Sequence, residues 1–344
     1  MSDEILFEKR GKAGVAILNR PKALNALSHG MVKALAGRLT QWADDPSVAH
    51  VVVKGAGDKA FCAGGDIRSI YDARMEGRTE GLSRFFGDEY ILNAQIKSFP
   101  KPYISLIDGI VMGGGVGVSV HGSHRIGTEK TMFAMPETGI GFFPDVGGSY
   151  FLPRMPRKSG VYCALSAGRL KQGDALATGV LTHAVSTDSL ADIEQALETA
   201  DDIGAAIAPH LIVPERGPIT QNLDLIEEIF SGESVAAILE RLEASTHDFA
   251  GETLKAINGK SPTSVLIAFE EMQRGGSLSF EECMKLEYRI VSRILQGNDF
   301  FEGVRAVLVD KDHAPKWSPS LISEVDSSDL ASYFEEPADG DLPL

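Results

Sequence analysis

The chain has 344 residues, of which 43% are hydrophobic, and its formal net charge at neutral pH is −15. This length is enough for one large domain or two modest ones, each with a proper core. The acidic balance argues against a nucleic acid or an anionic membrane surface as the main partner, because both require clustered lysine and arginine. We therefore expect a soluble globular protein, which could still bind a small anionic ligand through a local basic patch.

The cysteines and the N-terminal segment bear on the cellular compartment. The three cysteines, Cys62, Cys163 and Cys283, are too few and too widely spaced for a disulfide framework or a four-thiolate metal site. The first residues show neither a secretory signal nor an arginine-rich transit peptide, and no run reaches the roughly 18 apolar residues of a spanning helix. These features predict a cytoplasmic protein, or one of the mitochondrial matrix if a transit peptide has been removed.

The first half of the chain alternates strand and helix patterns. Residues 4–9 and 13–18 predict a hairpin, and residues 27–45 have helical periodicity with Ser28 as the cap. The later elements are strands at 50–57, 103–109 and 124–135 and helices at 66–77, 82–99, 147–167 and 171–178, with a glycine-rich turn at 111–122 that should open another helix. This order predicts an α/β unit of repeated βαβ character.

From about residue 189 the pattern changes to helices alone. The expected helices are 189–202, 223–232, 234–244, 264–275 and 279–297, with a connector at 210–218. The acidic, proline-bearing end of the chain is expected to be loose. We therefore predict three parts: an α/β core at 1–188, a helical region at 189–335 and a flexible acidic tail at 336–344.

Two glycine clusters and two acids stand out as candidate chemistry. The clusters, at 61–70 and 109–117, each follow a predicted strand and lead into a predicted helix, so that their backbone N–H groups could hold an oxygen atom. Glu137 and Asp145 lie in an apolar, glycine-rich segment, where an isolated buried carboxylate is costly. Turns and caps are the plain alternatives for each feature alone, and together the features favour a catalytic site. No histidine or cysteine spacing indicates a metal site.

Four stretches resemble a known family. They are "NRPKALNALS" at 19–28, "FCAGGDI" at 61–67, "GGGVGVSVHG" at 113–122 and "FAMPETGIGFFPDVGGSYFLPR" at 133–154. With "LEYRI" at 286–290 and the segment 299–317, they make the chain similar to the crotonase (enoyl-CoA hydratase/isomerase) superfamily, and within it to the 3-hydroxyisobutyryl-CoA hydrolases. The resemblance spans nearly the whole chain and implies a crotonase-like spiral of ββα units followed by a helical C-terminal region.

The resemblance also implies roles for individual residues. The backbone N–H groups of Gly65 and Gly114 would form an oxyanion hole for a coenzyme A thioester. Arg68, Lys22 and Arg20 would bind the phosphates of coenzyme A, although ordinary solvated cations are an equal alternative for each. Coenzyme A would be part of the substrate, with no further cofactor.

Two departures from the hydratases in the superfamily define the expected chemistry. Where hydratases carry a glutamate in the helix after the glycine triplet, this chain has Gly117, and where they usually carry glycine it has Asp145. Glu137 supplies the remaining family glutamate. The pair Glu137 and Asp145 matches the hydrolase pattern. Glu89, on the predicted helix at 82–99, would bind the substrate hydroxyl or be a solvated helix acid.

We therefore expect hydrolysis of a short branched 3-hydroxyacyl-CoA thioester, a step of valine catabolism. Glu137 would attack the carbonyl covalently or act as a general base, and Asp145 would orient the substrate hydroxyl or activate water. A hydratase or isomerase of the same fold and a non-enzymatic superfamily member remain as alternatives. The oligomeric state is open, and a homo-oligomer is compatible with the family.

Overall fold

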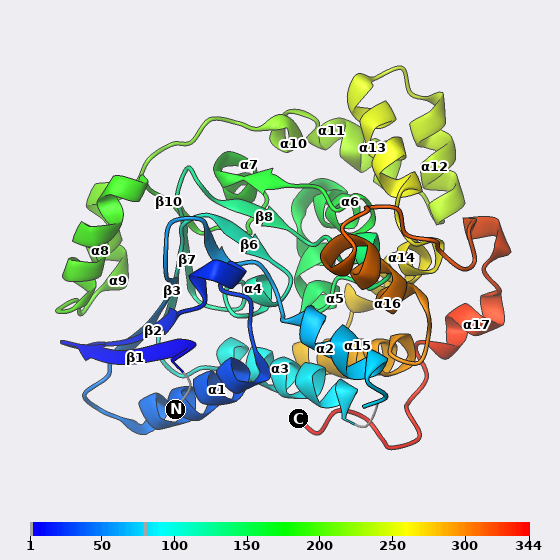
Figure 1. Cartoon of the computed structure of the whole chain (residues 1–344). Helices are drawn as coiled ribbons and strands as arrows, with labels where there is room; N and C mark the ends of the chain where they lie inside the picture. Colours follow the sequence, from blue (N-terminus) through cyan, green and yellow to red (C-terminus); the bar gives the residue numbers. More distant parts are fainter. Residues whose placement is uncertain (1–2, 79–80) are drawn as a thin grey trace. The chain divides into compact units, whose positions relative to one another are not determined.

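The computed structural model describes residues 3–78 and 81–344, and by packing the chain divides into two units (Figure 1). The first unit comprises Met1–Gly65, Ile91–Phe133 and Leu170–Gln221. The second comprises Asp66–Tyr90, Ala134–Arg169 and Asn222–Leu344. The two units interleave along the sequence. The three parts predicted from composition, 1–188, 189–335 and 336–344, are instead continuous segments, and their boundaries stay a prediction.

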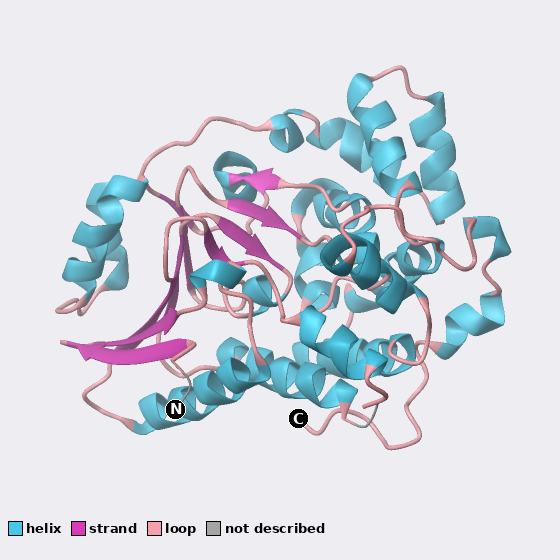
Figure 2. Ribbon diagram, in the orientation of Figure 1, coloured by secondary structure: helices cyan, strands magenta, loops and turns pink. Residues whose placement is uncertain are grey.

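A six-stranded sheet forms the centre of the first unit (Figure 2). Its strands in spatial order are β1 (Ile5–Arg10), β2 (Ala13–Leu18), β3 (His50–Gly55), β5 (Tyr103–Ile107), β7 (His124–Gly127) and β10 (His183–Ala184). Strands β1 and β2 are antiparallel and the other neighbours are parallel. The predicted hairpin is therefore confirmed, and Gly11 turns it with φ of +55°.

A second, four-stranded sheet carries the glycine-rich turns. Its order is β4 (Ala60–Cys62), β6 (Ile110–Met112), β8 (Met132–Ala134) and β9 (Leu170–Lys171). These strands are two or three residues long, too short for a periodic pattern, and the sequence analysis missed three of them. The predicted strand at 124–135 is in fact two strands, β7 and β8, which belong to different sheets.

The first unit also contains short and long helices, of which α8 (Leu190–Leu197) and α9 (Ile203–Ile207) pack on the large sheet. The others include η1 (Pro21–Ala23), α1 (His29–Asp44), α4 (Gly114–Gly117), α7 (Gln172–Ala177), η5 (Thr187–Ser189), η6 (Ala208–His210) and α10 (Pro218–Gln221). Ser28 caps α1 as predicted, accepting a hydrogen bond from Met31 N at 3.2 Å. Ile193, Leu197 and Ile207 from α8 and α9 form one buried core with sheet residues such as Val52 and Ile104.

The second unit is helical (Figure 2). Its elements are α2 (Ile67–Met75), the first part of α3 (Leu82–Lys97), η2 (Glu137–Ile140), α5 (Gly148–Phe151), η3 (Leu152–Arg154), η4 (Pro156–Lys158), α6 (Ser159–Ser166), α11 (Leu223–Phe230), α12 (Val235–Ala244), α13 (Asp248–Asn258), α14 (Pro262–Gly275), α15 (Phe280–Ile294), α16 (Asp299–Val304), the π-helix η7 (Arg305–Val309), η8 (Ile322–Glu324) and α17 (Ser327–Ser332). The helix predicted over 147–167 is broken into four pieces, because Pro153 and Pro156 cannot donate to a helical ladder.

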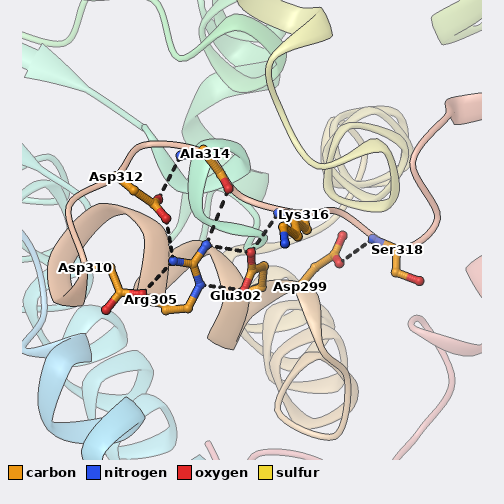
Figure 3. Close-up of polar contacts among 8 residues, drawn as sticks. All are labelled: Asp299, Glu302, Arg305, Asp310, Asp312, Ala314, Lys316 and Ser318. Atoms are coloured by element: carbon orange, nitrogen blue, oxygen red, sulfur yellow. Dashed lines mark hydrogen bonds and ion pairs between the residues drawn. The ribbon is translucent and has the colours of Figure 1, made fainter.

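An arginine-centred network holds the segment that follows α16 (Figure 3). Arg305 donates two hydrogen bonds of 2.8 Å to Glu302 and one of 2.7 Å each to Asp310 and Asp312. Glu302 also accepts from Lys316 N at 2.7 Å. A single guanidinium thus connects the helix to residues 310–316, which contain no regular helix or strand.

The end of the chain requires a correction. Residues 336–344 were predicted to be a flexible tail, yet Leu342 is buried and packs close to Gly87. Asp341 accepts hydrogen bonds of 2.7 and 2.5 Å from Arg289. Composition alone missed this packing, because it depends on one apolar and one acidic side chain finding distant partners.

Candidate active site

Two glycine turns of the first unit lie side by side. Strands β4 and β6 pair in parallel, with Ala60 opposite Ile110, and each strand leads into its own turn. A Cβ atom added to Gly64 would lie 4.0 Å from Gly114 N, which shows how closely the turns approach. The glycines are required here, because Gly64 has φ of +124°, a conformation that side chains rarely permit.

The N–H groups of Gly65 and Gly114 are available for a ligand. Among residues 3–78 and 81–344, neither donates a hydrogen bond to another group. Gly114 is the first residue of α4, where backbone donors have no partner within the helix. The structure therefore brings the two predicted donors onto adjoining turns, as an oxyanion hole requires. Their role in binding an oxyanion stays a prediction.

The second unit gathers the three predicted acids in its interior. Glu89, Glu137 and Asp145 are 2%, 5% and 4% exposed. Glu89 is therefore not a solvated helix acid. Glu137 opens η2 after Pro136, and its Oε2 atom has no partner within the described chain. Asp145 accepts a hydrogen bond of 2.9 Å from the hydroxyl of Tyr90.

Burial controls the protonation of these acids. It raises the pKa of Asp145 to about 7, although the hydrogen bond from Tyr90 acts in the opposite direction. The pKa values of Glu137 and Glu89 are raised well above their usual range, first by burial and then by the charge of Asp145. Because like charges in a low-dielectric interior repel, burial and the charge of Asp145 both favour the protonated forms of Glu137 and Glu89.

Three further residues belong to the acid cluster and were missed by sequence reasoning as site residues. They are Tyr90, Glu271 and Glu287, all of them completely buried. Glu287 accepts hydrogen bonds from the turn that follows Asp145. Neither carboxyl oxygen of Glu271 has a partner within the described chain. A glutamate on the apolar face of an amphipathic helix was the available signal, since Glu287 shares that face of α15 with Met284 and Ile290.

The predicted coenzyme A cations have different surroundings. Arg68 is exposed on α2 and pairs with Asp72 at 2.9 Å, and it also donates to Leu308 O at 3.3 Å. Arg20 is partly buried and donates to Ala26 O at 2.7 Å, so that it supports its own loop. Lys22 is exposed in η1, and within the described ranges no ion pair is found for it. Of the three, Lys22 has the most freedom to meet a phosphate.

Comparison with known proteins decides the family. The family model described as enoyl-CoA hydratase/isomerase matches residues 13–334. The chain belongs to this family. It is 46% identical to the mitochondrial 3-hydroxyisobutyryl-CoA hydrolase of Xenopus tropicalis over 99% of this chain and 91% of the relative. The human protein of the same name is 43% identical over 99% and 91%.

Solved structures of the same family have other titles. A carnitinyl-CoA dehydratase from Mycobacterium thermoresistibile superposes with a TM-score of 0.94 at 41% identity, covering 99% of both chains. An enoyl-CoA hydratase from Rhodobacter sphaeroides 2.4.1 gives 0.93 at 37% identity, covering 99% of this chain and 100% of its own. The predicted crotonase-like fold with a helical C-terminal region is thereby confirmed.

Within residues 3–78 and 81–344, neither a metal-binding cluster nor a membrane-spanning helix is found. No cluster of three or more histidine, cysteine or acidic side chains is arranged to hold a metal ion. None of the described helices has the length and apolar character needed to cross a membrane.

Proposed function

We propose that the protein hydrolyses 3-hydroxyisobutyryl-CoA to 3-hydroxyisobutyrate and free coenzyme A, a step of valine catabolism. The observation that carries the proposal is the buried pair Glu137 and Asp145, which has no basic partner among its recorded contacts. The relatives named 3-hydroxyisobutyryl-CoA hydrolase, at 42–46% identity, support it.

The first chemical step is activation of the thioester carbonyl. We propose that Gly65 and Gly114 donate their N–H groups to the carbonyl oxygen and stabilise the negative charge that develops there. Removing one such donor typically costs about 3–4 kcal/mol of transition-state stabilisation. Glycine at position 117 leaves no carboxylate there for the water addition that hydratases perform.

Two routes then lead to the products. In the general-base route, a carboxylate takes a proton from water, the water oxygen bonds to the carbonyl carbon, and the C–S bond breaks as the thiolate receives a proton. In the covalent route, the Glu137 carboxylate displaces the thiolate to give an anhydride, which water then cleaves. The pKa of Asp145, about 7, and the hydrogen bond from Tyr90 that favours its charged form suit Asp145 to the activation of water.

The remaining candidates act on recognition. Glu89 and Asp145 would orient the substrate 3-hydroxyl, and Glu89 Oε1 has no partner within the described chain. Lys22, Arg20 and Arg68 would bind the phosphates of coenzyme A. The proposed chemistry needs no metal and no cofactor beyond the coenzyme A of the substrate.

A hydratase or dehydratase is the second candidate, because the two most extensively superposed structures described above have such titles. Gly117 and Asp145 argue against it. A thiol-release assay against acyl-CoAs with and without a 3-hydroxyl separates the two activities. We expect faster release of coenzyme A from 3-hydroxyisobutyryl-CoA than hydration of crotonyl-CoA. Efficient hydration without thiol release would refute the proposal.

The cellular location follows the relatives rather than composition. Their names include "mitochondrial", which supports the matrix alternative of the sequence analysis and gives no support to the cytoplasm. The proposed partner is the acyl-CoA substrate itself, and a homo-oligomer remains an untested expectation.

A further inference from the structure

Glu287 binds the turn that immediately follows Asp145. Its carboxylate accepts hydrogen bonds from Gly147 N at 2.9 Å, Ser149 N at 3.0 Å and Ser149 Oγ at 2.5 Å. The side chain is 0% exposed. Burial raises the pKa of Glu287 to about 8, and these three donors oppose that shift. One carboxylate therefore satisfies three donors within four residues of a candidate catalytic acid.

The turn itself has an unfavourable backbone conformation. Val146 has φ of +52°, and Gly147 has φ of +89°. A β-branched residue with positive φ is a conformational outlier. Such strain persists only where the surroundings determine it, so the hydrogen bonds that Glu287 accepts and the 2.8 Å bond from Gly148 N to Asp145 O act as restraints on the turn.

Packing of α14 restrains the same turn from another element. A Cβ atom on Gly275 would lie 1.9 Å from Ser149 O, so this glycine permits close approach of the two backbones. The neighbouring Glu271 on α14 is equally buried, but it has no hydrogen-bond partner within the described chain. Burial and proximity to acids are therefore common to both glutamates, whereas bonding to the turn is recorded for Glu287.

We propose that Glu287 is a positioning residue, which fixes the 145–149 turn and thereby directs the Asp145 carboxylate. An apolar side chain could fill the same volume without the cost of burying a carboxyl group. The three hydrogen bonds are therefore what a glutamate contributes at this position. Tyr90 holds the carboxylate itself, and Glu287 holds the backbone that carries it. The inference rests on the proposed function, in which Asp145 acts on water or on the substrate hydroxyl.

A double-mutant cycle tests the inference. Glu287→Gln preserves volume and should lower kcat for thiol release by about 10²-fold, the usual effect of a small misplacement of a catalytic group. In an Asp145→Asn background, the same change should cost less than about threefold, because the group it positions is already absent. A loss of equal factor in both backgrounds would overturn the inference, since it would indicate a general structural role.

Two more variants sharpen the experiment. Ser149→Ala removes one of the three donors and should give a smaller loss that is likewise absent with Asp145→Asn; it serves if Glu287→Gln does not fold. Asp174→Asn is the matched control, because Asp174 is also a buried carboxyl that accepts hydrogen bonds from a turn, from Ile219 N, Thr220 N and Thr220 Oγ1, and it should leave kcat nearly unchanged. Equal losses in Asp174→Asn and Glu287→Gln would also overturn the inference.

The outcome is separable from the proposed function. Wild-type thiol release tests the function by itself, before any variant is compared. If the wild-type enzyme instead hydrates crotonyl-CoA, the cycle is repeated with that reaction, and the coupling between Glu287 and Asp145 is measured all the same. Normal kcat in folded Glu287→Gln contradicts the inference with either substrate.

Discussion

Removing the Tyr90 hydroxyl should shift the pH dependence of the enzyme. Tyr90 donates to Asp145 Oδ2 at 2.9 Å, and burial keeps the pKa of this tyrosine well above its usual value, so the hydroxyl remains a donor. A hydrogen bond to a charged group contributes about 1.5–3 kcal/mol. Because 1.36 kcal/mol corresponds to one pKa unit, Tyr90→Phe should raise the pKa of Asp145 from about 7 by about 1–2 units.

The sign follows from which form the hydroxyl stabilises. It stabilises ionised Asp145, so its loss favours the protonated form, and the acidic limb of kcat/KM should move to higher pH. At pH 7 the turnover should fall about tenfold or more, and at pH 9 it should largely recover. The assay is thiol release from 3-hydroxyisobutyryl-CoA between pH 5 and 9, at constant ionic strength.

The matched control is Tyr103→Phe. Tyr103 is also buried. Its substitution removes a hydrogen bond of the same length, which the hydroxyl donates to Val118 O at 2.9 Å and which involves no acid. Its pH profile should coincide with that of the wild-type enzyme. If the acidic limb of the kcat/KM profile is not shifted in folded Tyr90→Phe, or is shifted equally in both variants, Asp145 is not the group that produces this limb.

Further substitutions test the oxyanion hole, the two acids and the effect of a buried acid on stability. Gly114→Pro removes the proposed donor and should lower kcat by on the order of 10²-fold with the fold intact by melting curve; normal turnover would place the carbonyl elsewhere. Glu137→Gln should nearly abolish hydrolysis of every acyl-CoA, whereas Asp145→Asn should impair hydroxylated substrates most if Asp145 binds the hydroxyl, and all alike if it activates water. Glu271 has a raised pKa in the fold, so its stabilising contribution falls as pH rises above the pKa that it has in the unfolded chain. Glu271→Gln should therefore raise Tm more at pH 8 than at pH 5, and substitution of its partly exposed neighbour, Glu270→Gln, should not.

The covalent and general-base routes differ in where the water oxygen goes. Single-turnover hydrolysis in ¹⁸O water labels the Glu137 side chain only if an anhydride forms there, whereas direct attack by water labels only the product acid. Mass spectrometry of the peptide that contains Glu137 distinguishes the two. The result bears on the roles of Glu137 and Asp145 and leaves the substrate class untouched.

Local patterns predicted the fold where a segment was long enough to have a period. The hairpin, α1 with its Ser28 cap and the amphipathic α15 are all periodic over six or more residues. Strand β4 has three residues, and its place opposite β6 depends on tertiary packing. The broken helix at 147–167 could have been predicted, because its prolines were visible in the sequence.

The sequence predicted the motifs of the candidate site, but it did not predict the surroundings of their side chains. Glu137 and Asp145 were recognised because acids in an apolar segment are unusual. Tyr90 was passed over because a tyrosine on a helix is unremarkable until the carboxylate that it faces is known. Glu287 was noticed only as part of the family-like stretch 286–290, because its hydrogen-bond partners lie 138 and 140 residues away along the chain. Sequence therefore indicates which acids matter, and only the fold shows what sets their protonation.

The acid cluster explains how two carboxyl groups close together in the chain can perform different tasks. Glu137 and Asp145 are both buried, and burial raises the pKa of each. The hydroxyl of Tyr90 favours the charged form of Asp145, and once Asp145 is ionised its charge holds the proton on Glu137. In the general-base route of the proposed function, that proton would be available for the departing thiolate and the Asp145 carboxylate for water, whereas the covalent route would require Glu137 to lose its proton first. Environments that push two pKa values apart assign one base and one acid, and in this chain the group that favours the charged form of Asp145 is the hydroxyl of Tyr90. The positioning role that we propose for Glu287 would add a restraint on the turn that carries Asp145.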